Sequence, residues 1–318
     1  MAFSFPDIYK HVAELYTLGN FTIDDIVLHD GRTFIDTPGG NALYSALGAH
    51  VWLERVGLLA RVGNDLPPTY LDTLAVFNLE IVPTYVPFPN IHDWALYEPD
   101  GTRQFVNHRQ SGANDDLSIR AADLRLEQCR ARAYHIAPMP TAIQSELAQA
   151  LKRADNFVSL DPHEWWIKGN ETVLLDLVSR IDFFLPSREQ AELVYGRDDP
   201  ERAVCEFARH VARAAVVKLG AAGSLVYDVA QRHLAHIPIY PARVVDVTGA
   251  GDAYCGGFLA GYLETHDAVQ AACYGTVSAS FCIEHLGALS TKTRPRSEAE
   301  QRLAFVREHI QLLNTLGG

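Results

Sequence analysis

The sequence predicts an α/β fold with a mostly parallel sheet and a small additional β flap, and three observations support this. From about residue 130 onward, short apolar runs alternate with amphipathic stretches, which is the pattern of βα units. The alternating segments 94–98 and 103–107 are joined by Glu98-Pro-Asp-Gly101, a strong turn signal. No internal repeat or Gly/Ser linker divides the 318 residues. We therefore expect one composite domain over residues 1–318.

The expected elements fall into two groups along the chain. In the first third, strand-like runs occupy residues 13–18, 23–28, 55–62, 80–86, 94–98 and 103–107. Later, AYHIA, FVSLDP, IDFFLP and AVVKLG indicate buried strands, and TAIQSELAQALKRAD, ETVLLDLVSR, REQAELVYG and PERAVCEFARHVARA indicate the helices between them. Ligands of parallel sheets gather at the carboxyl ends of the strands, so we expect a site in the loops after Leu160, Leu185 and Leu219.

Composition and charge exclude several classes of protein. Apolar residues make up 48% and charged residues 21% of the chain, which is typical of a soluble globular protein. Lys and Arg number 27 against 39 Asp and Glu, and no basic block occurs, so neither a nucleic-acid nor a polybasic membrane partner is expected. The N-terminus lacks a secretory pattern and no run of about 18 apolar residues occurs, so we expect no membrane span and a cytoplasmic location.

The cysteines and histidines give no metal signature. The five cysteines are widely spaced and form no CxxC pair, so we interpret them as reduced, mostly buried thiols. The 13 histidines form no HExxH motif, and the closest pair, His233 and His236, has no further ligands beside it. His163, Trp165 and Trp166 follow a predicted strand, where packing between helix and sheet is the favoured interpretation.

The segment from Arg243 to Leu263 holds the strongest chemical signal. A β-branched run leads into Thr248-Gly-Ala-Gly251, and an apolar stretch of helical character begins at Asp252. Small residues let the backbone approach a ligand closely, and the amides that open the helix point into the same space, which makes an anion hole. An anion hole beside a carboxylate base is what phosphoryl transfer to a hydroxyl requires. A glycine turn with Asp252 as a helix N-cap is the alternative interpretation.

A series of motifs resembles a known family. Asp246-Val-Thr-Gly-Ala-Gly-Asp252, with the AYCGGFLAGYL that follows, resembles the C-terminal signature of the ribokinase-like (PfkB) family of carbohydrate kinases. Pro38-Gly-Gly-Asn-Ala-Leu-Tyr-Ser-Ala-Leu-Gly48 and the segment 56–65 resemble its N-terminal signature. Further matches, in family order, are Gly19 with Asp24, Ser111-Gly-Ala-Asn-Asp-Asp-Leu117, Lys218-Leu-Gly-Ala-Ala-Gly223 and His285-Leu-Gly-Ala288.

The resemblance implies a ribokinase-like, three-layer, doubly wound, mostly parallel sheet flanked by helices, with a small β-sheet lid formed by about residues 21–37 and 90–110. It also implies transfer of the γ-phosphoryl group of ATP to a hydroxyl of a sugar or sugar-like small molecule, with Mg²⁺. The lid would close over the sugar and exclude water, and it is a candidate homodimer contact. The alternatives are a catalytically silent homologue and a nucleoside kinase, the latter motivated by lid aromatics: Phe88, Trp94, Tyr97 and Phe105.

The resemblance also assigns roles to individual residues. Asp252 would be the catalytic base, and the anion-hole amides would come from Gly249, Ala250 and Gly251. Substrate hydroxyls would be held by Asp24, Gly39, Gly40 and Asn41, with Arg109 on the lid as a further candidate contact. The ATP-binding residues would be Ser187, Lys218, Gly220, Gly223 and Thr248. Asp246, with carbonyls near Cys282 and Gly287, matches a position where many family members hold a monovalent cation, so K⁺ is a candidate ligand.

The chain departs from the family pattern after the predicted strand IDFFLP. Where the family usually has Asn-x-x-Glu, which helps to organise Mg²⁺ and phosphate, this chain has Ser187-Arg-Glu-Gln190. A substitute carboxylate at Glu189 or Glu192, weakened metal organisation, and direct phosphate contact by Arg188 are the open alternatives. Asp161 ends a predicted strand and is a further candidate to face the site. A second departure, Pro67 in place of a common glycine, is interpreted as a turn variant.

Overall fold

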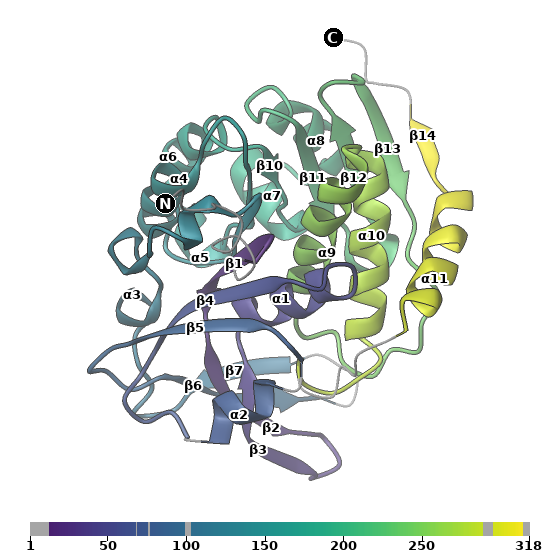
Figure 1. Ribbon diagram of the computed structural model, residues 1–318. Coiled ribbons are helices and arrows are strands. Elements are labelled where there is room, and N and C mark those ends of the chain that lie inside the picture. Colours follow the sequence, from purple (N-terminus) through teal and green to yellow (C-terminus); the bar gives the residue numbers. More distant parts are fainter. Residues whose placement is uncertain (1–12, 68, 76, 99–102, 289–294, 314–318) are drawn as a thin grey trace, which may run out of the picture.

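A ten-stranded sheet forms the centre of the protein. The computed structural model describes residues 13–67, 69–75, 77–98, 103–288 and 295–313. The strand order is β14-β13-β12-β11-β10-β9-β8-β1-β4-β5 (Figure 1). Neighbours from β11 to β5 are parallel, whereas β12, β13 and β14 pair antiparallel at one edge, so the expected mostly parallel sheet is confirmed. The strands are β1 (Leu15–Asn20), β4 (Val56–Val62), β5 (Glu80–Tyr85), β8 (Ala133–Ile136), β9 (Phe157–Leu160), β10 (Phe183–Phe184), β11 (Ala214–Lys218), β12 (Ser224–Asp228), β13 (His233–Ile237) and β14 (Gln311–Leu313).

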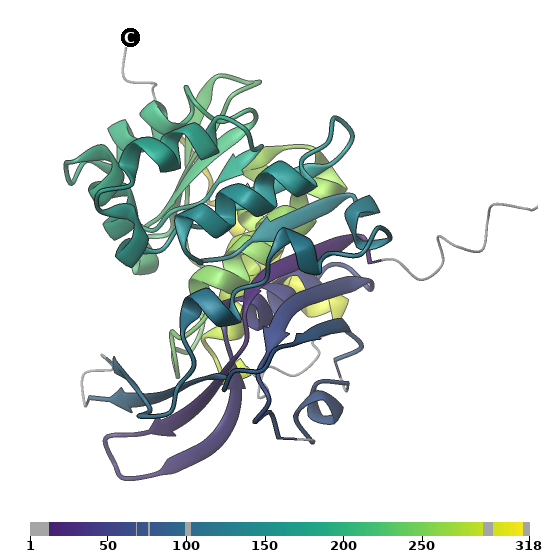
Figure 2. The ribbon, with the colours of Figure 1, turned by 90° about the vertical axis from the view of Figure 1, so that its left-hand side faces the viewer.

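Helices cover both faces of this sheet (Figures 1 and 2). One core unites Leu43, Phe258 and Phe281 from α1, α9 and α10, and a second core unites Leu147 and Phe207 from α4 and α8. The sheet lies between the two cores, so the doubly wound, three-layer arrangement is confirmed. The helices are α1 (Asn41–His50), α2 (Thr69–Ala75), α3 (Asn114–Leu117), α4 (Thr141–Leu151), α5 (Glu164–Ile167), α6 (Glu171–Val178), α7 (Arg188–Tyr195), α8 (Pro200–Phe207), α9 (Ala250–Thr265), α10 (Ala268–Cys282) and α11 (Arg296–Glu308).

A separate four-stranded sheet, the lid, lies beside the carboxyl end of β1 (Figure 2). Its order is β3-β2-β6-β7, with β2 (Thr22–Val27), β3 (Thr33–Gly39), β6 (Ile91–Tyr97) and β7 (Arg103–Asn107). The expected lid segments, 21–37 and 90–110, contain most of these strands. The predicted turn at Glu98–Gly101 lies mostly outside the described residues, but the strands that flank it pair antiparallel.

Strand β3 is the lid element that sequence patterns miss. Its residues include Pro38 and Gly39, and both residue types argue against a strand interior. The strand pairs only with β2 and lies at the edge of the lid, where a missing backbone donor is tolerated.

Two glycines fix the position of the site relative to the core. A Cβ atom at Gly48 in α1 would lie 2.1 Å from the carbonyl oxygen of Ala253, and one at Gly256 in α9 would lie 1.8 Å from that of Ser45. The two helix backbones therefore approach more closely than any other residue type allows. This contact holds the start of α9 beside the start of α1.

The cysteines fit the expectation of core thiols. All five are free, and Cys255, Cys273 and Cys282 are buried. Among the described residues, no helix is both long and apolar enough to span a membrane.

Candidate active site at the carboxyl edge of the sheet

The Thr248–Gly251 turn opens helix α9 as an anion hole. Gly249 is the N-cap residue with φ of 74°, and no side chain caps this helix terminus. The ring of Tyr44 occupies the space beside Gly249 where a Cβ would lie, so only glycine fits there. The first turn of α9 thus presents uncapped amides and the positive end of the helix dipole. The interpretation of Asp252 as the N-cap is wrong, because Gly249 holds that position and Asp252 lies in the first turn.

Asp252 has the electrostatic character of a base. Its carboxyl group is partly buried beside α1 and the turn, and this loss of solvation, together with the negative charge of Asp161, raises its pKa to about 7. The positive charges of Lys218 and Arg103 act in the opposite direction. A carboxylate with a pKa near the working pH can both hold and release a proton, as a general base must.

Lys218 brings a buried cation to the same turn. Its Nζ atom donates to Asp161 Oδ2 at 2.5 Å and lies 3.4 Å from Cys255 Sγ. A Cβ at Gly251 would lie 3.5 Å from that Nζ, so the ammonium group adjoins the opening of α9. Burial acts to lower the pKa of Lys218, but the negative charge of Asp161 and the hydrogen bond to it raise that pKa above its usual value, which keeps the ammonium protonated. The expectation that Asp161 reaches the site agrees with this contact.

The remaining predicted ATP-binding residues lie around Lys218. Ser187 forms an isolated parallel bridge with Lys218, so the ends of their two strands adjoin. Gly220 (φ 58°) and Gly223 (φ 88°) bound the short turn that follows β11, and a Cβ at Gly223 would meet the carbonyl oxygen of Ile237. The structure therefore brings these predicted residues together on one side of the anion hole.

The departure at Ser187-Arg-Glu-Gln190 has a structural explanation. Ser187 and Gln190 cap each other at the start of α7: Gln190 N–H donates to Ser187 Oγ at 3.2 Å, and Ser187 N–H donates to Gln190 Oε1 at 2.7 Å. Arg188 is engaged in an exposed ion pair with Asp198. The carboxylate next to this capping box is Glu164, whose Oε2 accepts a 3.5 Å hydrogen bond from Gln190 Nε2.

On the other side of the anion hole, Asp24 pairs with Thr37 of β3, and its carboxyl group lies against Gly39. The Thr22 hydroxyl donates to Asp24 Oδ1 at 2.8 Å, and a Cβ at Gly39 would lie 2.0 Å from Asp24 Oδ2. Burial raises the pKa of Asp24 to about 7, with Asp93 adding to the effect. Gly40 (φ 101°) leads the chain from this point into α1.

The side-chain amide of Asn41 forms two hydrogen bonds to the backbone. Its Oδ1 accepts from the Asn20 amide at 2.8 Å, and its Nδ2 donates to the Pro138 carbonyl at 2.7 Å. These bonds tie the start of α1 to the ends of β1 and β8. For the predicted contact with substrate hydroxyls, the second N–H of this amide and the second lone pair of its Oδ1 remain.

Asp246 joins the lid to the anion hole. Its Oδ1 accepts from the Tyr97 hydroxyl at 2.7 Å and from the Thr248 amide at 2.8 Å, and its Oδ2 accepts from the Gly287 amide at 3.4 Å. The Tyr97 hydroxyl also contacts Thr248 Oγ1 at 2.8 Å. The lid strand β6 is therefore anchored on the turn that carries the candidate base.

The lid cation nearest the candidate base is Arg103, which sequence reasoning missed in favour of Arg109. By strand register, Arg103 pairs with Tyr97 and shares the face of the lid that carries Asp24. Its Nε atom is buried and has no hydrogen-bond partner among the residues that the structure describes, and its charge acts on Asp252. Arg109 is exposed in the turn after β7. The sequence signal for this placement is the strand-like pattern of residues 103–107. Side chains alternate along a strand, so residues 103, 105 and 107 lie on one face.

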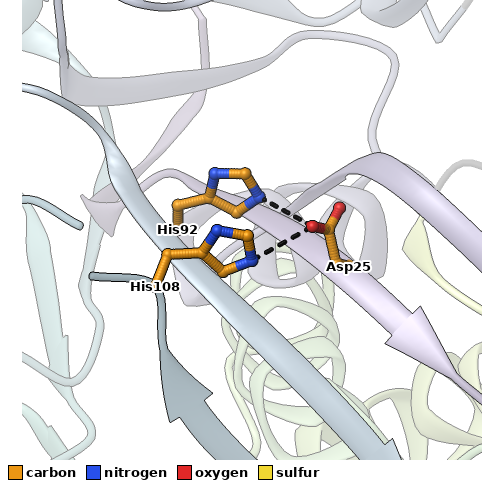
Figure 3. A group of neighbouring side chains, drawn as sticks. All are labelled: Asp25, His92 and His108. Carbon is orange, nitrogen blue, oxygen red and sulfur yellow. Dashed lines mark ion pairs between the residues drawn. The ribbon is translucent and has the colours of Figure 1, made fainter. Parts of the chain in front are cut away.

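A histidine cluster lies on the opposite face of the lid (Figure 3). Asp25, His92 and His108 place one ligand atom each within 4.8 Å of one another. Sequence spacing could not reveal this group, because its members come from three separate segments. His236, from the pair considered in the sequence, instead contacts the Ala222 carbonyl at 2.7 Å.

The aromatic residues after β9 differ from expectation in one respect. His163, Trp165 and Trp166 contact one another at centroid distances of 4.9 to 6.1 Å. Trp165 is nevertheless 67% exposed, so the expectation that it packs between helix and sheet is wrong.

Comparisons with known proteins identify the family of this chain. The model of the pfkB family carbohydrate kinases matches residues 15–294. A cytidine kinase from Thermococcus kodakarensis is 31% identical over 254 residues, which cover 78% of this chain and 88% of that protein. A fructokinase from Escherichia coli is 29% identical over 80% of this chain and 85% of its own length.

Solved structures show the same fold. The Methanocaldococcus jannaschii nucleoside kinase superposes with a TM-score of 0.73 at 21% identity, covering 92% of this chain and 98% of that one. A putative ribokinase II from E. coli, in complex with ATP and Mg²⁺, superposes with a TM-score of 0.76 at 19% identity, covering 92% and 100%. From the motifs, the topology and the match over residues 15–294, this chain belongs to the pfkB family of carbohydrate kinases.

Proposed function

We propose that the protein transfers the γ-phosphoryl group of ATP to a hydroxyl of a sugar or sugar-like small molecule. The observation that carries this proposal is the arrangement at the start of α9. There, the Asp252 carboxyl group, with a pKa raised to about 7, adjoins uncapped helix amides and the Lys218 ammonium. A base beside an anion-stabilising hole supports phosphoryl transfer to a hydroxyl. A silent binding protein would have no use for this base.

In the proposed reaction, Asp24 accepts a hydrogen bond from a substrate hydroxyl and fixes the orientation of the sugar. Asp252 takes the proton of the reacting hydroxyl as its oxygen forms a bond to the γ-phosphorus. The bond from that phosphorus to the bridging oxygen breaks, and ADP leaves with the electron pair. The amides of the 249–251 turn and the Lys218 ammonium stabilise the negative charge on the transferred group.

Arg103 is the lid residue that would place a further positive charge beside the transferred phosphoryl group. Its guanidinium is on the Asp24 face of the lid, and its buried Nε has no partner among the described residues. We assign it to the phosphoryl group or an anionic substrate group when the lid is closed. An unsatisfied buried donor is stabilised by such an acceptor.

The nucleotide would lie along Ser187, Gly220, Gly223 and Thr248. The loop from β13 to α9 exposes apolar side chains beside this surface: Ile239 at 45%, Val244 at 61% and Val245 at 47%. Exposed apolar groups in a row favour contact with a flat ring such as adenine.

The donor set fits Mg²⁺ bound mainly through phosphate. Ser187 and Gln190 are engaged with each other, while Glu164 and Asp161 Oδ1, a buried oxygen without a partner among the described residues, remain as oxygen ligands. Mg²⁺ usually binds through one or two carboxylates plus phosphates and water. When bound, the ion neutralises phosphate charge. Glu164 replaces Glu189 and Glu192 as the proposed substitute, since it contacts Gln190 directly.

Binding of K⁺ beside Asp246 stays a prediction. Three donors already engage its carboxylate, and the Ile283 carbonyl accepts from the Val245 and Asp246 amides. We therefore assign Asp246 to ordering the Thr248–Gly251 turn, and we route no step through K⁺.

A nucleoside is the second candidate substrate, favoured by exposed rings on the Asp24 face of the lid. Phe34 and Phe105 are 41% and 49% exposed, and strand register places both on that face. Such rings can stack on a base. Trp94 instead stacks on His108, and Tyr97 is bound to Asp246, so these two of the expected aromatics are engaged elsewhere. The similarity to a cytidine kinase supports the same candidate.

The experiment measures ADP release from ATP and Mg²⁺ with matched acceptors: ribose, fructose, cytidine, uridine and adenosine. We expect acceptor-dependent ADP release with at least one of them. A nucleoside preference that falls in Phe105→Ala, while ribose turnover is unchanged, would favour the second candidate. No ADP release with any acceptor, in a protein that binds ATP, would favour the silent homologue.

The lid is also our proposed homodimer contact. It exposes Ile35 at 52% and Val106 at 46%, and burial of such side chains favours association. Sedimentation velocity of the protein and of Val106→Glu tests this: the dimer should be lost in the variant, and a monomeric parent protein would contradict the proposal.

A further inference from the structure

Three side chains with metal-binding atoms converge in the lid (Figure 3). Asp25 comes from β2, His92 from β6, and His108 directly follows β7. The Nε2 atoms of His92 and His108 lie 3.2 Å and 3.1 Å from the same oxygen, Asp25 Oδ2. Because side chains alternate along a strand, Asp24 and Asp25 point to opposite faces. The cluster is therefore separate from the site proposed for ATP and sugar.

The backbone holds these three residues in place. The His108 amide donates to the His92 carbonyl at 2.8 Å, and the His92 amide donates to Ser111 Oγ at 3.0 Å. Asp25 is 3% exposed, and its other oxygen, Oδ1, accepts from the Asp36 amide at 2.8 Å. A bond of this kind orients a carboxylate and leaves its second oxygen free for a ligand.

The polar atoms of the cluster lack adequate partners. Both Nε2 atoms are buried, and within the described part of the chain neither forms an aligned hydrogen bond in spite of its short distance to Asp25 Oδ2. A buried carboxylate requires a compensating positive charge. Among the described residues, His92 and His108 form the ion pairs of Asp25, and an imidazole carries charge only if protonated. A bound cation would satisfy all three groups together.

We propose that Asp25, His92 and His108 bind a first-row divalent metal ion, with Zn²⁺ as the best fit. Two imidazole nitrogens and one carboxylate oxygen form a common ligand set for Zn²⁺. Ligands about 2.0 to 2.2 Å from a tetrahedral ion lie about 3.3 Å from one another, which is close to the two distances observed here. The fourth position belongs to water, because the His92 and His108 side chains are 22% and 23% exposed.

Binding requires the two imidazole rings to move. Their planes are 10° from parallel, with centroids 3.7 Å apart, and His108 also stacks on Trp94 at 4.6 Å. Lone pairs of parallel rings do not converge on one ion, so the rings must rotate out of the stack. The ring torsion of histidine is broad, and the partial exposure of both rings leaves space for this rotation. The bound ion would crosslink β2, β6 and the end of β7, which makes its role structural.

The test uses the full chain, treated with a chelator and kept free of ATP at pH 7.5. Titration with Co²⁺ is followed by its visible absorption bands, and titration with Zn²⁺ is followed by calorimetry. We expect one equivalent to bind with a Kd below about 10 µM, and the wild-type melting temperature to rise with Zn²⁺. Asp25→Asn and His108→Phe should weaken binding at least about tenfold. His108→Phe keeps an aromatic ring in the stack but has no ligand atom.

Control variants separate this site from other histidines and from misfolding. His210→Gln removes an exposed histidine outside the lid and should bind Co²⁺ as the wild type does. Metal-free circular dichroism must show that Asp25→Asn and His108→Phe are folded; if one is not, His92→Gln takes its place. Absence of saturable binding by the wild-type protein, or equal binding by the folded variants, would overturn the proposal.

Discussion

Asp24, which is buried, and Asp252, which is half-buried, both have a carboxyl pKa of about 7 but different surroundings. Asp252 adjoins uncapped helix amides and the field of two cations, Lys218 and Arg103. Asp24 is held by the hydroxyl of Thr22 and faces further carboxylates, with no cation among the influences on its pKa. A raised pKa is therefore compatible with two different tasks. Asp252 would accept a proton beside the anion hole, and Asp24 would accept a hydrogen bond that positions a substrate hydroxyl.

After replacement of Asp252 itself, we expect replacement of Lys218 to lower kcat the most. Replacement of the ammonium in Lys218→Met should lower kcat about 10² to 10³-fold, because it removes charge stabilisation at the anion hole. The variant also leaves Asp161 buried without its cation, which destabilises the fold. The double variant Asp161→Asn/Lys218→Met is the matched control, since it restores a neutral pair. Steady-state kinetics showing full kcat in that double variant would remove Lys218 from the mechanism.

Asp24→Asn should act mainly on substrate binding. The amide keeps an oxygen that can accept from Thr22 but loses the negative charge that favours a substrate hydroxyl. We expect KM for the acceptor to rise about tenfold or more, with a smaller change in kcat and no change in KM for ATP. A fall in kcat as large as that of Asp252→Asn, at unchanged KM, would contradict the division of tasks between the two carboxyl groups.

The raised pKa of Asp252 also makes a prediction about stability. The folded state keeps this proton up to about pH 7, whereas the unfolded chain releases it near pH 4, so stability is lost as pH rises between these values. Asp252→Asn imitates the protonated group. Its free energy of unfolding relative to wild type should therefore increase from pH 4 to 7 and then level off. A difference that is independent of pH, measured by urea unfolding, would contradict the raised pKa.

Arg188→Ala gives the smallest expected effect. Arg188 is exposed and paired with Asp198, and exposed ion pairs contribute little to stability. We expect kcat and KM for ATP within about twofold of wild type. Glu164→Gln is the comparison, and it should raise the Mg²⁺ concentration needed for half-maximal rate. A large rise in KM for ATP in Arg188→Ala would instead assign that residue to phosphate.

A region can be predicted from the sequence more fully when its residues lie close together along the chain. The anion hole lies within one segment, and its strand, turn and helix follow from the small residues at 249–251 and the apolar run after Asp252. The contact between Lys218, Asp161 and Cys255 joins β11, β9 and α9, and no pattern in the sequence measures that distance. Its members become neighbours only because their strands end at one edge of a parallel sheet.

The lid is less predictable because its geometry depends on register. Arg103 lies on the Asp24 face of β7, whereas Arg109 lies in the turn after that strand, and the sequence does not fix where the strand ends. Strand β3 is hidden by Pro38 and Gly39, which an edge strand tolerates. Asp25, His92 and His108 meet only through the pairing of β2, β6 and β7.

The most direct test of the central claim compares the pH dependence of turnover in the wild-type protein and Asp252→Asn with one accepted hydroxyl substrate. We predict that kcat/KM of the wild type rises with pH to a plateau, with a midpoint near the Asp252 pKa of about 7. In Asp252→Asn, kcat should fall about 10²-fold or more, and this rise should disappear while ATP still binds. Near-normal turnover with the same pH profile in the variant would contradict the role of Asp252 as the base.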